Sequence, residues 1–209
     1  MKAPKYKNLS QVAGWLASGK VGVIPTDTLY GIVGSALRRK TVERIYRLRR
    51  RNPQKPMIIL IGDARAIARF GVQLDRPTAE VLKKMWPGKI SVVLPIVSRS
   101  AALKKFKYLH CGGRSLAFRL PRPAWLRALL RKTGPLVAPT ANLEGKPPAK
   151  TIRAAKEYFG DRVDFYVDVG QLRAKPSTLL EIKNGRTTVV RQGAVKIKVS
   201  ASIMNTPFR

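Results

Sequence analysis

A group of polar side chains follows directly on a short apolar run near the start of the chain. Residues 21–25 are apolar, and residues 26–31 then supply two threonine hydroxyls, a carboxylate and a phenol. The run predicts a buried strand, and open α/β sheets bind ligands where such strands end. A polar turn whose side chains cap the next element explains the same residues equally well. The segment is therefore a candidate ligand site with two interpretations of equal weight.

Arginines then run through the end of a predicted helix: Arg47, Arg49, Arg50 and Arg51. Adjacent residues on a helix diverge, so we expect Arg47 and Arg50 to face away from Arg49. A guanidinium donates two parallel hydrogen bonds and suits phosphate. A solvated basic face is the usual explanation of such a run. The proline-punctuated loop at residues 52–56, able to fold over an anion, favours a phosphate site instead.

A single arginine interrupts the apolar run at residues 116–120. Burying the Arg119 charge alone is prohibitive, so it needs a partner. A structural salt bridge is one possibility, and a carboxylate ligand is the other, since the chain has only 11 Asp and Glu. A further predicted strand end, after residues 136–138, carries the hydroxyl of Thr140 and the amide of Asn142.

Several common catalytic arrangements are missing. His110 is the only histidine and Cys111 the only cysteine, so a histidine-rich metal site cannot form and any triad would have to use His110. Neither a Gly-x4-Gly-Lys-Ser/Thr loop nor a Gly-x-Gly-x2-Gly turn after a strand is present. We therefore predict no protein metal site, and if ATP is used, side chains and loop amides must hold its phosphates.

Strands and helices alternate through most of the chain. Helical spacing is found at residues 9–17, from Thr41 (a possible cap) to 48, and at 64–70, 77–85, 124–131 and 151–159. Strands are expected at residues 21–25, 57–61, 90–94, 116–120, 136–138, 165–167, 177–182 and 187–191. The alternation predicts an α/β fold, and the strand-rich end favours a mixed sheet. Residues 200–209 show no period, which predicts a loosely held tail.

Composition limits the class of protein. A length of 209 residues predicts one domain, with a core at about residues 9–193 and a tail at 194–209. No apolar run reaches the roughly 18 residues of a membrane span, and the basic start lacks an apolar signal core. A single cysteine fits a reducing cytoplasm. The net charge of +31 points to RNA or a nucleotide, although a proteome-wide basic bias explains the overall excess equally well.

The four segments above, with three others, stand in a fixed order along the chain. They are residues 25–31, 49–51, 86–88, 119–121, 140–145, 176–178 and 191–193. In this order they resemble the YrdC family of threonylcarbamoyl-AMP synthases, whose pattern is Pro-Thr-x-Thr-x-Tyr-Gly, Lys-x-Arg, Trp-Pro-Gly, Arg-x-Pro, Ser-Ala-Asn-x-Ser-Gly, Pro-Ser-Thr and Arg-x-Gly. The resemblance spans about residues 21–193. Three positions depart from it: Arg49 replaces lysine, Thr140 replaces serine, and Glu144 replaces a serine with a negative charge.

The resemblance implies a twisted mixed β-sheet with flanking helices and a positively charged concave face. It implies a reaction in which L-threonine, bicarbonate and ATP give threonylcarbamoyl-AMP and pyrophosphate for tRNA modification, with Mg²⁺ accompanying ATP and a downstream threonylcarbamoyl-transferase. Arg49 and Arg51 would be catalytic, and Thr28, Arg119 and Ser177 would hold threonine. The residues that would hold ATP are Arg51, Lys55, Ser115, Thr140, Asn142 and Arg191.

Two alternatives remain open at this point. The first is a non-catalytic protein that grips tRNA, ribosomal RNA or double-stranded RNA with the same basic face. The high charge favours it, whereas an RNA clamp has no need of Arg119 beside the Thr28 hydroxyl. The second is a carbamoyl-transferring relative like the YrdC-type domain of hydrogenase maturation factors, which normally lies in longer chains with zinc-binding cysteines.

Overall fold

The computed structural model describes residues 9–183 and 186–197, and it confirms the alternation of helices and strands. The helices are α1 (Leu9–Ala17), α2 (Arg39–Arg49), α3 (Arg76–Met85), α4 (Ala102–Lys105), α5 (Lys107–His110), α6 (Ala124–Thr133) and α7 (Ile152–Phe159), with 3-10 turns η1 (Ala64–Phe70) and η2 (Gly160–Arg162). The strands are β1 (Gly22–Pro25), β2 (Tyr30–Ser35), β3 (Ile59–Leu60), β4 (Ile90–Pro95), β5 (Ser115–Arg119), β6 (Leu136–Val137), β7 (Phe165–Tyr166), β8 (Thr178–Lys183) and β9 (Arg186–Arg191).

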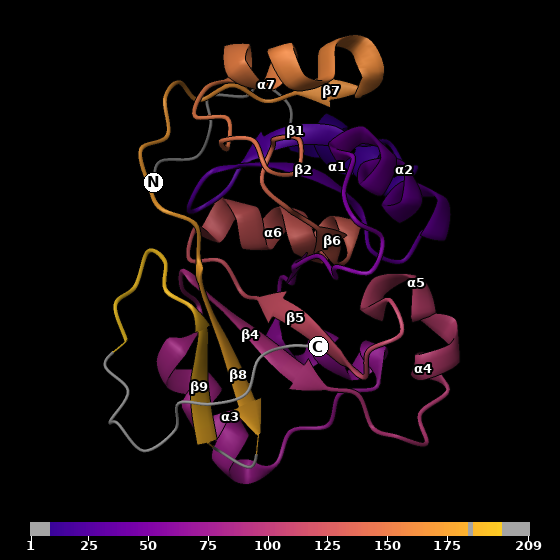
Figure 1. Cartoon of the computed structure of the whole chain (residues 1–209), viewed down its shortest axis with the longest axis vertical. Coiled ribbons are helices and arrows are strands. Elements are labelled where there is room, and N and C mark those ends of the chain that lie inside the picture. The colour runs from indigo at the N-terminus through magenta and orange to yellow at the C-terminus, as the bar shows by residue number, and fades with distance from the viewer. Residues whose placement is uncertain (1–8, 184–185, 198–209) are drawn as a thin grey trace.

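The strands form one mixed sheet, in the order β7-β1-β2-β6-β3-β5-β4-β8-β9 (Figure 1). The pairs β1–β7, β3–β5 and β4–β8 are parallel, and the others are antiparallel. The predicted mixed sheet is therefore confirmed. Among the described residues, no helix is long and apolar enough to span a membrane.

Alternating side chains of the central strands pack into two separate cores. Val23, Ile32 and Ile59 lie in the larger one, whereas their neighbours, among them Val33 and Leu60, lie in the core formed with α1 and α6. Within the described residues, this second core includes side chains from β1, β2, β3, β6 and β7 but none from β4, β8 or β9. The helices thus leave part of that sheet face uncovered.

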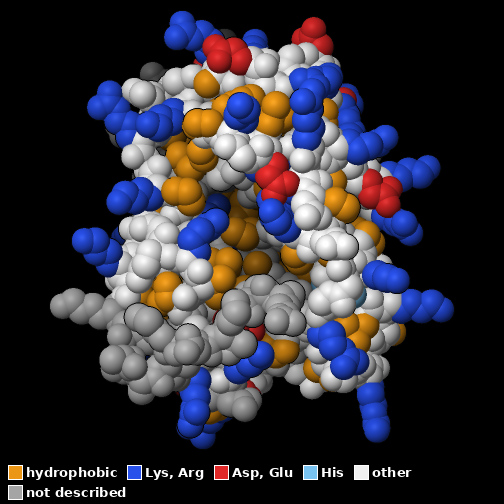
Figure 2. Space-filling model, viewed as in Figure 1, with side chains coloured by type: hydrophobic (Ala, Val, Ile, Leu, Met, Phe, Trp, Pro, Cys, Tyr) orange, Lys and Arg blue, Asp and Glu red, His pale blue; other side chains and the backbone are white. Residues whose placement is uncertain are grey.

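A hollow lies over this uncovered part, near the middle of the molecule (Figure 2). Apolar side chains are visible deep in the hollow, and Lys and Arg side chains surround it. The register pairs Leu60 with Arg119, so the side chain of Arg119 projects on the same face as Leu60. The fold therefore directs the in-strand arginine into the hollow.

The structure differs from the sequence-based expectations at β2 and at the start of α2. Residues 30–35 were not predicted as a strand, yet they form β2, which pairs with β1 in a hairpin. Thr41 does not cap α2, which begins at Arg39 after Arg38. Thr41 is instead buried against Gly34, where a Cβ atom would come within 2.4 Å of its methyl group. This close approach of helix and strand explains the glycine in the strand, and that glycine obscures the strand pattern. The short helices α4 and α5 were also not predicted, and the expected tail at residues 200–209 lies outside the described residues.

Candidate active site

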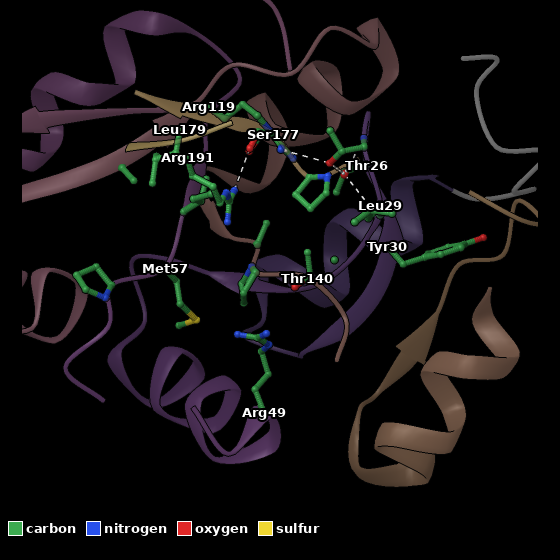
Figure 3. A pocket seen from close by; sticks show the side chains of 18 of the residues that line it. Thr26, Leu29, Tyr30, Arg49, Met57, Arg119, Thr140, Ser177, Leu179 and Arg191 are labelled. Atoms are coloured by element: carbon green, nitrogen blue, oxygen red, sulfur yellow. Dashed lines mark hydrogen bonds between the residues drawn. The ribbon is translucent and has the colours of Figure 1, made fainter. Parts of the chain in front are cut away.

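A cavity of about 180 Å³ lies in the hollow. Its side chains come from the β1–β2 turn, the end of α2, β5, the segment after β6 and the β8–β9 end of the sheet (Figure 3). Those that matter chemically are Thr26, Thr28, Arg49, Arg51, Arg119, Thr140, Ser177 and Arg191. The closed volume is below the roughly 300–1,000 Å³ of sites for drug-sized ligands. It suits a small molecule, while anything of nucleotide size must extend toward the opening.

Arg119 lies at one end of the cavity, where it forms a buried ion pair with Asp27. Its Nη2 is 3.3 Å from Oδ1 of Asp27, and both side chains are almost fully buried. Its Nη1 is 3.4 Å from the Thr28 hydroxyl, whereas its Nε has no hydrogen-bond partner among the described residues. The structural salt bridge considered from the sequence is therefore present, and a donor remains for a ligand.

The β1–β2 turn holds these partners in place. The Thr26 hydroxyl donates to the Leu29 carbonyl at 2.7 Å and accepts the Thr28 N–H at 3.2 Å. The turn is thus fixed by its own hydroxyl. The Thr28 hydroxyl lies 3.1 Å from that of Thr26 and accepts from Arg119 on its other side. Both interpretations of this segment hold: it is a polar turn, and it lines the cavity.

Ser177 and Arg191 complete the same end. The Ser177 hydroxyl is 2.9 Å from that of Ser91, and Arg191 donates to the Ser177 carbonyl at 2.9 Å. Figure 3 shows Arg191 and Ser177 on the Arg119 side of the cavity, with Arg49 and Thr140 facing them. Ser177 was predicted to bind threonine and Arg191 to bind ATP, and the structure brings the two together.

The opposite end is built on the C-terminus of α2. The N–H groups of Arg50 and Arg51 donate to the carbonyls of Arg47 and Tyr46, which is a Schellman motif with Arg50 in the left-handed conformation (φ 49°). The turn leaves Arg47 and Arg50 exposed and directs Arg49 inward, as predicted. Arg49 donates to the Asn142 carbonyl at 3.0 Å and to its side-chain oxygen at 2.9 Å. Its Nη1 is buried with no partner in the described chain.

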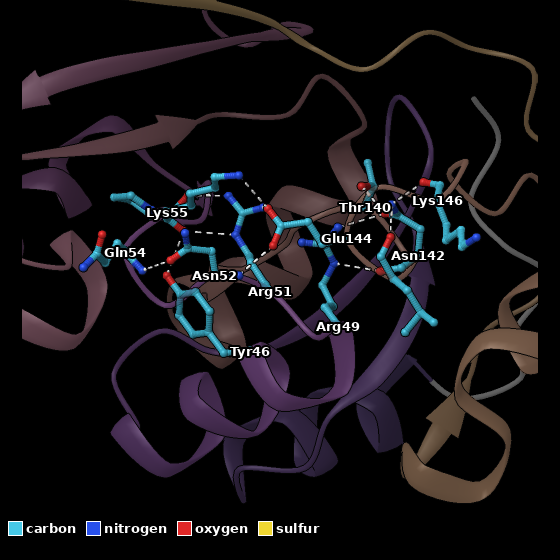
Figure 4. Close-up of polar contacts among 12 residues, drawn as sticks. Tyr46, Arg49, Arg51, Asn52, Gln54, Lys55, Thr140, Asn142, Glu144 and Lys146 are labelled. Carbon is cyan, nitrogen blue, oxygen red and sulfur yellow. Dashed lines mark hydrogen bonds and ion pairs between the residues drawn. The ribbon is translucent and has the colours of Figure 1, made fainter. Parts of the chain in front are cut away.

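A rim network joins this end to the loop after β6 (Figure 4). Arg51 donates to the carbonyls of Lys55 and Pro56, both at 3.0 Å. The carboxylate of Glu144 accepts from the Lys55 ammonium at 3.1 Å and from the Asn52 N–H at 2.6 Å, and lies 4.0 Å from Arg51. Lys55 therefore points to Glu144, and it is not among the cavity-lining residues.

Four guanidinium groups share this small space, and the pKa values of three of them, Arg119, Arg191 and Arg49, are lowered. Burial lowers the pKa of Arg119. The Asp27 carboxylate raises this pKa and so offsets part of the effect, whereas the charge of Arg191 lowers it further. Burial and the charge of Arg51 lower the pKa of Arg191, and the same two causes lower that of Arg49 to about 10. Each remains a cation at neutral pH, so the cavity is an anion site whose internal repulsion a bound anion would relieve.

The other predicted residues lie apart from the cavity. The side-chain oxygen of Asn142 accepts from Arg49 and from the Thr140 hydroxyl, the latter at 2.5 Å. Asn142 itself does not line the cavity. Ser115 shares the face of β5 with Ala117 and Arg119 but lies at the far end of that strand, outside the lining. Trp86 donates to the Ile90 carbonyl and packs in the core.

One functional residue had no predicted role. Asp27 was part of the matched segment, yet only the structure shows that it neutralises Arg119. The signal was the in-strand arginine itself, which requires an acidic partner, and Asp27 is an acid at the end of another predicted strand. In the described part of the chain, no three His, Cys, Asp or Glu residues gather as metal ligands.

Comparison with known proteins decides the family. The model of the family Sua5_yciO_yrdC, described as Telomere recombination, matches residues 15–193. The chain belongs to this family. It is 28% identical over 187 residues to the threonylcarbamoyl-AMP synthase of Marinobacter nauticus, covering 88% of this chain and 96% of that protein. The resemblance inferred from the motifs is confirmed.

Solved members of the family share the fold. The structure of P. abyssi Sua5 in complex with L-threonine matches with a TM-score of 0.78 and 26% identity over 88% of this chain, which spans 54% of that longer protein. E. coli YciO matches with a TM-score of 0.80 and 22% identity, covering 94% of both chains, and this likeness concerns the fold alone. The family fold predicted from the sequence is thus confirmed.

Proposed function

We propose that this protein is a threonylcarbamoyl-AMP synthase that converts L-threonine, bicarbonate and ATP to threonylcarbamoyl-AMP and pyrophosphate, for modification of tRNA. The observation that carries the proposal is the cavity itself. Four guanidinium groups line it, and one of them, that of Arg119, is paired with the buried carboxylate of Asp27. Among the described residues, Arg49 and Arg119 each retain a buried N–H without a hydrogen-bond partner. Unpaired buried donors are costly and rare in folded proteins, so they mark where ligand acceptors belong. Family relatives that bear this enzyme name support the same conclusion.

The two ends of the cavity match the two larger substrates. Arg119, with Thr28 and Ser177, would hold the threonine carboxylate, because its Nε is spare and its Nη2 is already neutralised. Arg49 and Arg51 would face the phosphates at the other end, with Thr140 beside them. Arg191, which lies beside Ser177, would reach the phosphates from the Arg119 side. The P. abyssi protein crystallised with L-threonine supports threonine as the amino-acid substrate of this chain as well.

The chemistry then needs no protein nucleophile. Bicarbonate takes up a proton and loses water to give carbon dioxide. The threonine amine attacks its carbon as one C–O π bond breaks, and the amine then releases a proton to leave a carbamate. A carbamate oxygen attacks the α-phosphorus, and the bond to the bridging oxygen breaks as pyrophosphate leaves with that electron pair. Positioning and charge neutralisation can carry such a displacement. Arg49 would stabilise charge on the α-phosphoryl oxygens, and Arg51 would stabilise charge on pyrophosphate.

Magnesium would enter with ATP. Glu144 is the carboxylate at the phosphate end, and it is held by Lys55 and the Asn52 N–H, so it is not positioned as part of an ion cage. The ion would take its oxygen ligands from the phosphates and water, as Mg²⁺ commonly does. When bound, it would supply further neutralisation of the triphosphate.

The decisive experiment uses the purified chain with ATP, bicarbonate and labelled threonine. We expect stoichiometric formation of pyrophosphate and of a labelled adenylate, and neither product when bicarbonate is removed. Pyrophosphate without a labelled adenylate would mean ATP cleavage of another kind. If neither product forms while both ligands bind, the catalytic proposal is wrong.

We also propose that tRNA is a partner, in the cytoplasm, and that a separate transferase receives the adenylate. Charge supports RNA contact: 42 Lys and Arg face 11 Asp and Glu. Affinity carried by phosphate contacts falls steeply with salt, so tRNA binding should weaken by about 10³-fold or more between roughly 50 and 200 mM salt if six or more phosphates are contacted. Filter binding across this range measures it, with threonine binding as the insensitive control. A flat response for tRNA would remove RNA from the proposal.

A further inference from the structure

Glu144 is an acidic residue at the rim of the cavity, beside the arginines that would bind phosphate. Glu144 follows the segment of Thr140 and Asn142, and its backbone N–H donates to the Arg49 carbonyl at 2.8 Å. This backbone bond and the two hydrogen bonds from the Arg49 side chain to Asn142 tie the loop after β6 to the end of α2. The Glu144 side chain is therefore not required to connect the two segments, and its role has to be sought in its charge.

The carboxylate collects the donors that a phosphate group would use. It accepts from a backbone N–H (Asn52, 2.6 Å) and an ammonium (Lys55, 3.1 Å), and a guanidinium (Arg51) lies 4.0 Å away. A main-chain amide with a lysine and an arginine is a common set of donors for phosphate oxygens. The pKa of Glu144 is lowered, first by the Asn52 N–H and then by Lys55, so the group is anionic at neutral pH.

Arg51 connects this carboxylate to the cavity. It lines the cavity wall, and its charge lowers the pKa values of both Arg49 and Arg191. Lys55 is directed away from the cavity by its ion pair with Glu144. The pair is also accessible: the Lys55 side chain is 60% exposed and that of Glu144 is 27% exposed, so water can replace either partner at low cost.

We propose that the Glu144 carboxylate is an internal anion that occupies a phosphate subsite formed by the Asn52 N–H, Lys55 and Arg51 in the ligand-free protein, and that a nucleotide phosphate must displace it. This inference rests on the proposed use of ATP. Nucleotide binding then frees Glu144 to move into solvent, and Lys55 turns to the phosphate. The carboxylate thus lowers the affinity for nucleotide while it holds residues 50–56 in order before nucleotide arrives.

The test measures two quantities that competition moves in opposite directions. Glu144→Gln keeps the shape but removes the charge, and Glu144→Ser removes both. We expect both variants to bind ATP about 3- to 10-fold more tightly by calorimetry without threonine, since a competing ion pair of modest strength is gone. In the same variants without nucleotide, the melting temperature should fall slightly, because the ion pair with Lys55 is lost.

Glu43→Gln is the matched control. It removes the same single charge from an exposed carboxylate, paired with Arg39 at 2.7 Å on α2. We expect its ATP affinity to change less than about 2-fold. Weaker ATP binding by both Glu144 variants, with folding intact, would overturn the proposal and make Glu144 a brace that ATP binding needs. An equal gain in Glu43→Gln would reduce the effect to overall charge. Because binding is read without threonine, failure of adenylate synthesis leaves this result interpretable.

Discussion

A cation is paired with a carboxylate beside each end of the cavity, but the two pairs lie at very different depths. At one end, Arg119 and Asp27 are 5% and 2% exposed, and at the other, Lys55 and Glu144 are 60% and 27% exposed. A buried charge cannot be left alone, whereas a rim charge can exchange its partner for water. The pair at the Arg119 end is therefore part of the fold, and the pair at the Glu144 end is available for exchange.

This difference fits what each end would bind. Threonine is small and would be held at the buried end, where Asp27 already orients Arg119. The triphosphate is large and strongly charged, and it would enter at the open end, where cations are exposed and one is held by Glu144. Preorganisation at the buried end gives selectivity, and exchange at the open end allows nucleotide to enter and pyrophosphate to leave.

The largest effect should come from removing Arg119. Arg119→Ala leaves Asp27 buried without its partner, which costs about 3–5 kcal/mol of folding stability for a broken buried pair. Urea unfolding followed by circular dichroism measures this loss. Lys83→Ala is the matched control, since it breaks an exposed pair with Glu80 (2.8 Å) and should cost only about 0–1 kcal/mol. Equal losses would show that the two kinds of pair do not differ as described.

A second substitution at the same position separates the fold from the ligand. Arg119→Lys retains a positive charge near Asp27, so we expect the protein to fold. It replaces the fork with a point charge, and threonine binding should weaken by roughly 1–3 kcal/mol. ATP affinity measured without threonine should change much less. Equal losses for both ligands would assign Arg119 to structure alone and remove it from the threonine site.

Sequence patterns predicted most of the fold because apolar periodicity is local. The helix α1 and the strands β1, β4, β5 and β8 lie where the spacing of apolar residues placed them, to within one or two residues. The strand β2 was not predicted, because Gly31 and Gly34 break its pattern and because the reason for Gly34 lies in α2. Contacts between distant elements cannot be read from local spacing.

The sequence predicted which residues belong to the site better than it predicted which of them contact one another. The sequence indicated that Arg119 needs an acidic partner and that Arg47 and Arg50 face away from Arg49, and the structure agrees. It could not identify Asp27 as that partner, because the turn of Asp27 and Thr28 is far from Arg119 in the sequence. Thr28 and Arg119 are 91 positions apart, and only the sheet brings the turn and the arginine together. Nor could it show that Lys55 is held by Glu144, which depends on the loop after β6.

The smallest effect we predict concerns Arg49, where the family pattern has a lysine. Burial and the charge of Arg51 lower the pKa of Arg49 to about 10, which is about 2.5 below its ordinary value of 12.5. The same burial and the charge of Arg51 would lower the pKa of a lysine at this position below its ordinary value of about 10.4. If the position acts as a cation, activity is lost as pH rises through the pKa of the group, and the wild type should stay active to about pH 9.

The experiment compares adenylate formation by Arg49→Lys and by the wild type across pH at saturating substrates. Taking the ratio of the two rates cancels the ionisation of threonine and of bicarbonate, which both proteins share. We expect a ratio close to one near pH 7 and a lower ratio by pH 9, because a desolvated lysine loses its proton at a lower pH than an arginine in the same place. Arg49→Ala should lose most activity at every pH. A constant ratio for the lysine variant would mean that its ammonium is not desolvated as Arg49 is. A fully active Arg49→Ala protein would transfer the phosphate role to Arg51 and Arg191, and the open end would then hold nucleotide without its buried cation.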